Sequence, residues 1–190
     1  MKITFLDAST VDAGDINLDC IRENGDLIIH STTSNNETLK RVIDSEIIIT
    51  NKVIIDKPII EASKKLKLIV VSATGYNNID VDAAKANNVT VCNVVDYSTP
   101  IVAQHTISLI LNLCGQTYKY LNEKSLWPAS PIFTRLDHRV TEISGKTLGI
   151  VGVGNIGSKV GEIAESMGMK IQVLARKDSK SLIHQEWPRL

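Results

Sequence analysis

Short runs rich in isoleucine and valine recur five times in the first 95 residues, and amphipathic segments separate them. The apolar runs occupy residues 2–6, 27–30, 46–50, 66–71 and 90–93. Helical patterns occupy residues 37–43, 58–63 and 81–87, and Asp80 stands at the N-cap position of the last one. Strands that alternate with helices pair in parallel, so this pattern predicts an α/β fold with a parallel sheet covered on both faces.

After Pro100 the pattern changes to one long helix over residues 101–122. Its apolar residues are dense enough to pack on more than one side, so we expect this helix to bridge two domains. A looser segment, residues 125–140, follows and contains two prolines. Its Trp127 and Phe133 look exposed, which indicates an arm that docks on another surface.

Charge and composition exclude several classes of partner. The 190 residues contain 21 basic and 21 acidic side chains, so the chain offers no electrostatic footprint for nucleic acid. No run has the length of a membrane span or of a signal peptide core, which predicts a soluble cytoplasmic protein. Cys20, Cys92 and Cys114 are far apart and lack metal-ligand spacing. We expect three buried thiols and no metal site.

The strongest local motif is Gly152-Val153-Gly154-Asn155-Ile156-Gly157, which fits G-x-G-x-x-G. A strand pattern at residues 146–152 precedes it, a helix pattern at residues 155–167 opens from it, and a strand pattern at residues 170–174 follows. The first glycine permits a tight turn, the second lets the backbone approach a pyrophosphate, and the third lets helix and strand pack closely. The helix N-terminus then faces the anion. Dinucleotide binding is therefore predicted, and an ordinary structural turn is the alternative.

The end of the second strand bears on the choice between NAD and NADP. NAD sites place an acidic residue about 20 residues along, on the adenosine ribose. Here that position falls at Ala175, and Arg176 and Lys177 follow it. Two cations without a carboxylate favour the 2′-phosphate of NADP. Asp178 is close enough to keep NAD open, and the cations can equally be a solvated loop.

The chain resembles the D-isomer-specific 2-hydroxyacid dehydrogenases, and within them the glycerate dehydrogenase or hydroxypyruvate reductase group. The resemblance extends roughly over residues 1–177. Its motifs are more specific than the glycine turn alone. They are TNKV at residues 50–53, SATGYNNIDVDAAKANNVTVCNV at 72–94, YSTPIVAQHTISLIL at 97–111 and EISGKTLGIVGVGNIG at 142–157.

The resemblance implies a flavodoxin-like substrate domain in residues 1–98 and the start of a Rossmann NAD(P)-binding domain in residues 99–190. It implies that the loop Ala73, Thr74, Gly75 and Tyr76 gives backbone N–H groups to the carboxylate of a small 2-oxo or 2-hydroxy acid. A loop after a parallel strand suits an anion, and a plain strand-to-helix turn is the alternative.

The resemblance also implies that Thr106 lies near the nicotinamide, with Gln104 in place of the commoner glutamate. The cofactor-binding residues expected are Thr106, Gly152, Gly154, Asn155, Ile156, Gly157, Arg176 and Lys177, with NADP favoured over NAD. The long helix and the Trp127 arm resemble the dimer contact of the family, which implies a homodimer.

Hydride transfer at C2 also needs a cation and an acid–base group. The family supplies them with an arginine and a histidine held by an acidic residue, and none of the 190 residues matches these. We therefore expect no catalytic residue here and little reductase activity from the chain alone. His184 beside Glu186 only superficially suggests an acid–base pair, and we expect His105 to be structural and His138 to lie on the surface of the arm.

A different class of function stays open. A chain that keeps the dinucleotide turn and the dimer contact but lacks the acid–base group fits a non-enzymatic dinucleotide-sensing or dimerisation module. A plain flavodoxin-like receiver or flavin module is disfavoured, because it has no place for a second glycine turn after the long helix.

Overall fold

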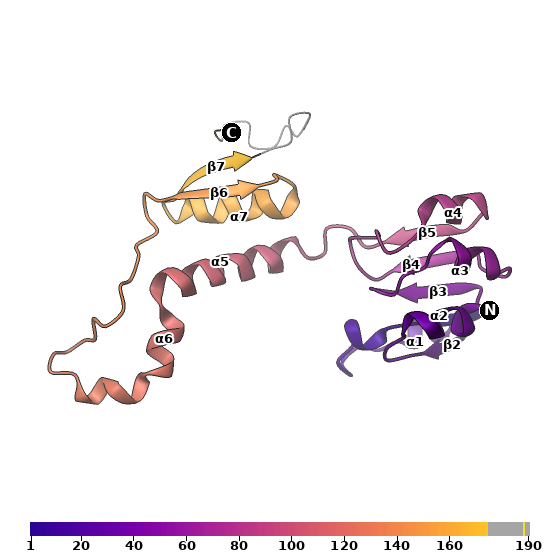
Figure 1. The fold of residues 1–190 in the computed structure, drawn as a ribbon, viewed down its shortest axis with the longest axis horizontal. Coiled ribbons are helices and arrows are strands. Elements are labelled where there is room, and N and C mark those ends of the chain that lie inside the picture. The colour runs from indigo at the N-terminus through magenta and orange to yellow at the C-terminus, as the bar shows by residue number, and fades with distance from the viewer. Residues whose placement is uncertain (175–187, 189–190) are drawn as a thin grey trace. The chain divides into compact units, whose positions relative to one another are not determined.

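The computed structural model describes residues 1–174 and Pro188, and the chain divides into two compact units (Figure 1). The first unit comprises Met1–Tyr97 and the second comprises Ser98–Leu190. No helix in the described part of the chain is long and apolar enough to cross a membrane.

The first unit contains a five-stranded parallel sheet in the order β2-β1-β3-β4-β5. The strands are β1 (Lys2–Phe5), β2 (Asp26–Ile29), β3 (Ile47–Thr50), β4 (Leu68–Val71) and β5 (Thr90–Asn93). A short 3-10 helix η1 (Ala8–Thr10) and the helices α1 (Asp19–Arg22), α2 (Asn35–Val42), α3 (Lys57–Ala62) and α4 (Val81–Ala86) connect them. This strand order is the flavodoxin-like one, so the predicted parallel sheet and fold class are confirmed.

Alternate residues of β3 and β4 enter different cores. On one face Ile48, Ile69 and Val71 pack with residues of α2, α3 and α4. On the other face Phe5 and Ile49 pack with the segment that contains η1 and α1. The period of two along β3 and β4 therefore gives each face its own apolar layer, as expected for a sheet covered on both sides.

Side-chain caps begin the helices that follow the strands. Ser34 and Glu37 form a capping box at the start of α2. Asp80 accepts a hydrogen bond from the N–H of Ala83 at 2.9 Å, which confirms it as the N-cap of α4.

The second unit begins with α5 (Thr99–Gly115), followed by α6 (Thr117–Asn122) and the 3-10 helix η2 (Lys124–Ala129). The prediction of one uninterrupted helix over residues 101–122 was wrong. Gln116 adopts a left-handed conformation with φ of 53°, and its side chain donates a hydrogen bond to the carbonyl of Leu113. A left-handed residue cannot continue a right-handed helix, so the chain restarts as α6.

A two-stranded parallel sheet completes the described part of the second unit. It consists of β6 (Thr147–Val151) and β7 (Lys170–Leu174), which α7 (Asn155–Ser166) connects. Ala103 and Ile107 of α5 share a core with Val160 and Ala164 of α7 and with β7. Only one side of α5 is packed in this way, because Leu109 and Leu113 on the same helix are exposed. Within one chain α5 thus packs on one side, and the packing of its other side stays a prediction.

The cysteines are not the buried thiols that we expected. Cys20 and Cys92 are exposed and Cys114 is partly exposed. Cys92 lies on the edge strand β5, where alternate residues face outward. Cys20 lies in the short helix α1, which buries none of its own residues. Among the described residues, no group of three or more potential ligands could hold a metal ion.

Candidate functional site

The turn between β6 and α7 has the geometry of an anion-binding site. Gly154 is the N-cap of α7, and the first turn of this helix contains no acidic side chain. The first N–H groups of a helix have no acceptor within the helix, and the helix dipole places positive charge at the same end. The turn therefore presents donors and an uncompensated positive field to a negatively charged group.

The structure gives a different physical reason for glycine at each of the three positions of the turn. Gly152 has φ of +92°, a conformation that L side chains rarely adopt. A Cβ atom on Gly157 would clash with the carbonyl oxygen of Gly152, so only glycine lets α7 begin this close to β6. Gly154 has an extended conformation and nothing within 4 Å of an added Cβ. Nothing in the described structure requires glycine at position 154, which leaves that space for a ligand.

The turn is tied to the end of the next strand. The N–H of Gly152 donates to the carbonyl of Leu174 at 3.0 Å. The carboxyl end of β7 therefore lies beside the glycine turn. Arg176 and Lys177, which we expect to bind the cofactor, lie outside the described residues, as do His184 and Glu186.

Thr106 lies on α5, the helix that packs against α7. Its hydroxyl donates to the carbonyl of Val102 at 2.8 Å, a bond within the helix. The same hydroxyl oxygen still has lone pairs to offer to another group. His105, the next residue back, is exposed.

The second candidate site is the loop after β4. Thr74 Oγ1 donates to the carbonyl of Val94 at 2.9 Å, and Asn93 Nδ2 donates to the carbonyl of Thr74 at 2.8 Å. These bonds fix the loop to the end of β5. The described residues supply no acceptor for the backbone N–H groups of Thr74, Gly75 and Tyr76, and all three residues are exposed. Three unused donors at the carboxyl edge of a parallel sheet suit a carboxylate.

Two neighbouring residues of that loop are part of the same arrangement. Ala73 is buried, and its carbonyl accepts from the N–H of Val94 at 3.1 Å. An added Cβ on Gly75 would make only an ordinary contact, with Asn77, so the chain itself does not exclude a side chain there. The loop is thus anchored at Ala73 and open from Thr74 onward.

Sequence reasoning missed one buried residue at this edge of the sheet. Asp7 follows β1 and is only 4% exposed, and its carboxylate accepts hydrogen bonds from the N–H groups of Asn51 and Lys52. The available signal was a single aspartate directly after an apolar strand. Such a residue more often caps a turn, so the sequence alone did not distinguish it.

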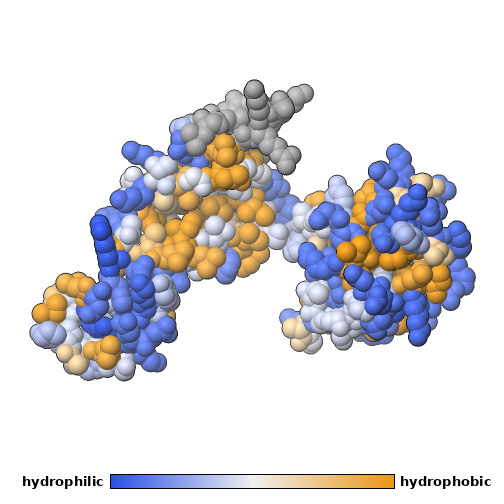
Figure 2. Space-filling view, viewed as in Figure 1, coloured by the Kyte–Doolittle hydropathy of each residue, from blue (hydrophilic) through white to orange (hydrophobic). Residues whose placement is uncertain are grey.

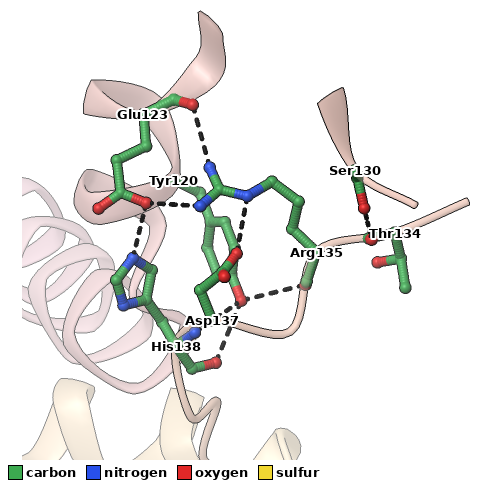
Figure 3. Close-up of polar contacts among 7 residues, drawn as sticks. All are labelled: Tyr120, Glu123, Ser130, Thr134, Arg135, Asp137 and His138. Atoms are coloured by element: carbon green, nitrogen blue, oxygen red, sulfur yellow. Dashed lines mark hydrogen bonds and ion pairs between the residues drawn. The ribbon is translucent and has the colours of Figure 1, made fainter. Parts of the chain in front are cut away.

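The arm, residues 125–140, folds back on the end of α6 through Arg135, whose side chain is largely buried (Figure 3). Arg135 is 9% exposed, and its guanidinium contacts the Glu123 carboxylate at 2.9 Å and Asp137 at 2.7 Å. His138 Nε2 lies 3.0 Å from the same Glu123 oxygen, and its ring meets the ring of Tyr120 edge-on at 5.1 Å. His138 is partly buried rather than fully exposed, because the ring of Tyr120 on α6 and the carboxylate of Glu123, which directly follows α6, both contact it.

The arm also exposes apolar side chains, and Figure 2 shows apolar groups on the surface of the second unit. Phe133 is 96% exposed and Trp127 is 45% exposed, which agrees with the expected exposure of both.

Fold and site together define an α/β protein in which a flavodoxin-like unit precedes a βαβ unit with a dinucleotide-type glycine turn. Residues 7–180 match the family model described as the D-isomer specific 2-hydroxyacid dehydrogenase catalytic domain. The chain belongs to this family of oxidoreductases.

Individual relatives agree with this assignment. A hydroxypyruvate reductase of Blautia hydrogenotrophica is 32% identical over 176 residues, which cover 90% of this chain and 55% of the relative. An acyclic imino acid reductase, solved in complex with NADPH and D-Arg, superimposes with a TM-score of 0.80 at 26% identity, over 100% of this chain and 60% of that one. The 3-phosphoglycerate dehydrogenase of Entamoeba histolytica with bound NAD⁺ gives a TM-score of 0.71 at 26% identity, over 95% and 56%. The chain therefore spans little more than half the length of the relatives it matches.

Because glycine is required at position 157 but not at position 154, alanine substitutions at the two positions should change the stability of the second unit by different amounts. Gly157→Ala places a methyl group against the Gly152 carbonyl, so we expect a loss of about 1–3 kcal/mol in the free energy of unfolding of the second unit. Gly154→Ala meets open space with an allowed conformation, so we expect a change below about 1 kcal/mol. Urea unfolding followed by circular dichroism measures both, and equal losses would contradict the assignment of separate causes.

The arm should loosen in acid. The hydrogen bond from His138, followed by that from Arg135, holds the pKa of Glu123 below its usual value of 4.5, although partial burial opposes the shift. A depressed pKa means that the stabilisation is present above pH 4.5 and is lost as the pH falls through the lower folded value. In a Trp187→Phe background, we expect the emission of Trp127 to change over that acid range and Glu123→Gln to abolish this change.

Glu37 is the control for the arm, since hydrogen bonds from Ser34 lower its pKa in the same direction. It lies in the first unit, so Glu37→Gln should leave the acid change in Trp127 emission intact. If Glu37→Gln abolished the acid-induced change in Trp127 emission as Glu123→Gln does, the change would reflect general acid unfolding and not the loosening of the arm.

Proposed function

We propose that this chain binds a nicotinamide dinucleotide at the Gly152–Gly157 turn and a small 2-oxo or 2-hydroxy acid at the Thr74–Tyr76 loop. The reaction would be hydride transfer to or from C2 of the acid, as in a hydroxypyruvate reductase or glycerate dehydrogenase. The observation that carries the proposal is the set of three unused N–H donors on a loop at the carboxyl edge of the parallel sheet. The relative named hydroxypyruvate reductase supports this substrate class.

The glycine turn fits the pyrophosphate of the cofactor. The space beside Gly154 is open, and the positive end of α7 points to it. Gly152, Gly154, Asn155, Ile156 and Gly157 would line this pyrophosphate site. The cofactor would supply the hydride, while the turn would bind and orient it.

NADP is proposed over NAD because Arg176 and Lys177 follow β7, whose end is bonded to Gly152. Both cations can pair with a 2′-phosphate. Thr106 is proposed to lie near the nicotinamide because its helix, α5, packs against α7.

The substrate loop would act by holding the acid in place. Backbone N–H donors can bind a carboxylate without a side chain in the way. The hydrogen bonds of Thr74 to Val94 and Asn93 keep these donors in place before the acid binds. Fixed donors reduce the entropy lost on binding and favour one orientation of C2.

Calorimetric titration with NADPH tests the cofactor site. We expect Gly154→Ala to weaken NADPH binding at least tenfold, because the methyl group takes the space of the pyrophosphate. Gly149→Ala is the matched control, since position 149 in β6 also has nothing within 4 Å of an added Cβ. Equal affinities of both variants and the wild type would refute binding at the turn. Weaker binding of NADPH but not NADH after Arg176→Ala would support NADP.

The second candidate function is a dinucleotide-sensing or dimerisation module. The resemblance favours this module, because no residue of the chain corresponds to the acid–base pair of the family. Absorbance of the reduced nicotinamide with hydroxypyruvate or glyoxylate distinguishes the two functions. Turnover at ordinary enzyme rates would exclude the module, and tight binding without turnover would support it.

A homodimer through α5 and the arm is proposed for either function. The exposed apolar residues available are Leu109, Leu113, Leu121, Phe133 and Leu136. Large exposed apolar patches on a protein surface are typical of interaction sites.

Sedimentation velocity tests the homodimer. Leu113 is 61% exposed and Phe133 is 96% exposed. Charges at these positions should prevent an apolar interface without affecting a core, so we expect Leu113→Asp and Phe133→Asp to sediment as monomers. Ile54→Asp is the control, because Ile54 is 51% exposed in the first unit. A wild-type chain that stays monomeric at high concentration would refute the interface.

A further inference from the structure

The buried carboxylate of Asp7 binds the chain just beyond β3 with both of its oxygens. Oδ1 accepts from the N–H of Asn51 at 2.9 Å, and Oδ2 accepts from the N–H of Lys52 at 2.7 Å. Burying a carboxylate is costly unless it is well satisfied, and here two successive amides satisfy it. The first two residues after β3 are therefore held in one conformation.

Neighbouring side chains restrain the same turn from other sides. Asn51 Nδ2 donates to Thr10 Oγ1 at 3.0 Å, and Thr10 Oγ1 donates to the carbonyl of Asp7 at 2.7 Å. The N–H of Val53 donates to Thr50 Oγ1 at 3.1 Å. Lys52 thus lies in the middle of a turn whose backbone has little freedom.

This turn lies beside the proposed substrate loop. Strands β3 and β4 are parallel neighbours with Thr50 opposite Val71, so residues just beyond both strands share one edge. The N–H of Ser72 donates to the carbonyl of Thr50 at 2.9 Å, and Asn78 Nδ2 donates to the carbonyl of Val53 at 2.9 Å. The loop after β3 and the loop after β4 are therefore bonded into one body.

Lys52 brings a charge that the substrate loop lacks. Its side chain is exposed, and no carboxylate among the described residues forms an ion pair with it. By contrast, Lys65 and Lys67 pair with Asp44 and Glu46 at the other end of the sheet. The donors of Thr74–Tyr76 are neutral, so an anion bound there would still need a cation.

We propose that Asp7 is a positioning residue that presents Lys52 to the carboxylate of the substrate. The Lys52 ammonium would bind the anion together with the N–H donors of the loop after β4, and Asp7 would act only through the backbone of the turn. This inference rests on the proposed substrate site, and it adds the cation of that site and the residue that orients it.

The experiment titrates the full chain with hydroxypyruvate and follows backbone amide resonances of both loops. We expect Lys52→Met to raise the dissociation constant about tenfold, the effect of losing one charge-assisted hydrogen bond, and Lys52→Arg to stay within about threefold of the wild type. Lys65→Met is the control for removing a surface lysine and should leave the constant unchanged.

A double-mutant cycle tests the role of Asp7. Asp7→Asn keeps the shape but presents an amide nitrogen to one of the two N–H groups, so we expect weaker binding in the chain that has Lys52. In the Lys52→Met background the same change should have no further effect, because a positioning residue has nothing left to orient. Asp12→Asn is the control, since Asp12 accepts three backbone N–H bonds in an exposed loop.

Each outcome has a defined meaning. No shift of either loop in the wild type would overturn the proposed substrate site and this inference together. Shifts at Thr74–Tyr76 that Lys52→Met leaves unchanged would overturn this inference alone. Additive effects of Asp7→Asn and Lys52→Met would assign Asp7 a purely structural role. Lys52 is exposed, so its variants fold and keep the test decisive even if Asp7→Asn does not fold.

Discussion

Parallel strand pairing is the constraint on which both candidate sites depend. Parallel strands bring their carboxyl ends to one edge, so loops far apart in sequence meet there without a dedicated scaffold. In the first unit the pairing of Thr50 with Val71 brings the chain after β3 beside the chain after β4. In the second unit the pairing of β6 with β7 joins the glycine turn to Leu174. Each unit thus has a ligand edge that depends on its own backbone hydrogen bonds.

The parts that sequence predicted are those in which backbone geometry alone selects the residue. Gly152 and Gly157 are required by a positive φ and by a close carbonyl, and the alternation in β3 and β4 follows from two buried faces. The break at Gln116 was missed although Gly115 directly precedes it, because a single glycine is tolerated within a helix and the left-handed residue itself is a glutamine. The burial of Asp7 and the contacts of His138 were not foreseen, because the partners of Asp7 lie 44 and 45 residues away and the partner of His138 lies 15 residues away. Only the fold brings these residues together.

The arm shows how an exposed segment can keep a defined shape. Its order comes from polar contacts between Arg135, Glu123 and His138 and from the ring of Tyr120, while its apolar residues point outward. A segment held by its own polar network keeps its apolar side chains available, because they are not needed for its internal packing. Ordering the segment in advance also reduces the entropy lost when a partner docks.

The two candidate sites bind anions by different means. The glycine turn relies on a helix N-terminus, whose partial charges are fixed by the backbone and need no side chain. The loop after β4 starts no helix at Thr74, so its N–H groups have no such field behind them. A carboxylate held there by neutral donors gains less than one that also meets a full positive charge. The loop after β4 would therefore gain from a nearby cation, and the buried Asp7 fixes the turn that carries Lys52. The glycine turn needs no such lysine, because the N-terminus of α7 already supplies positive charge.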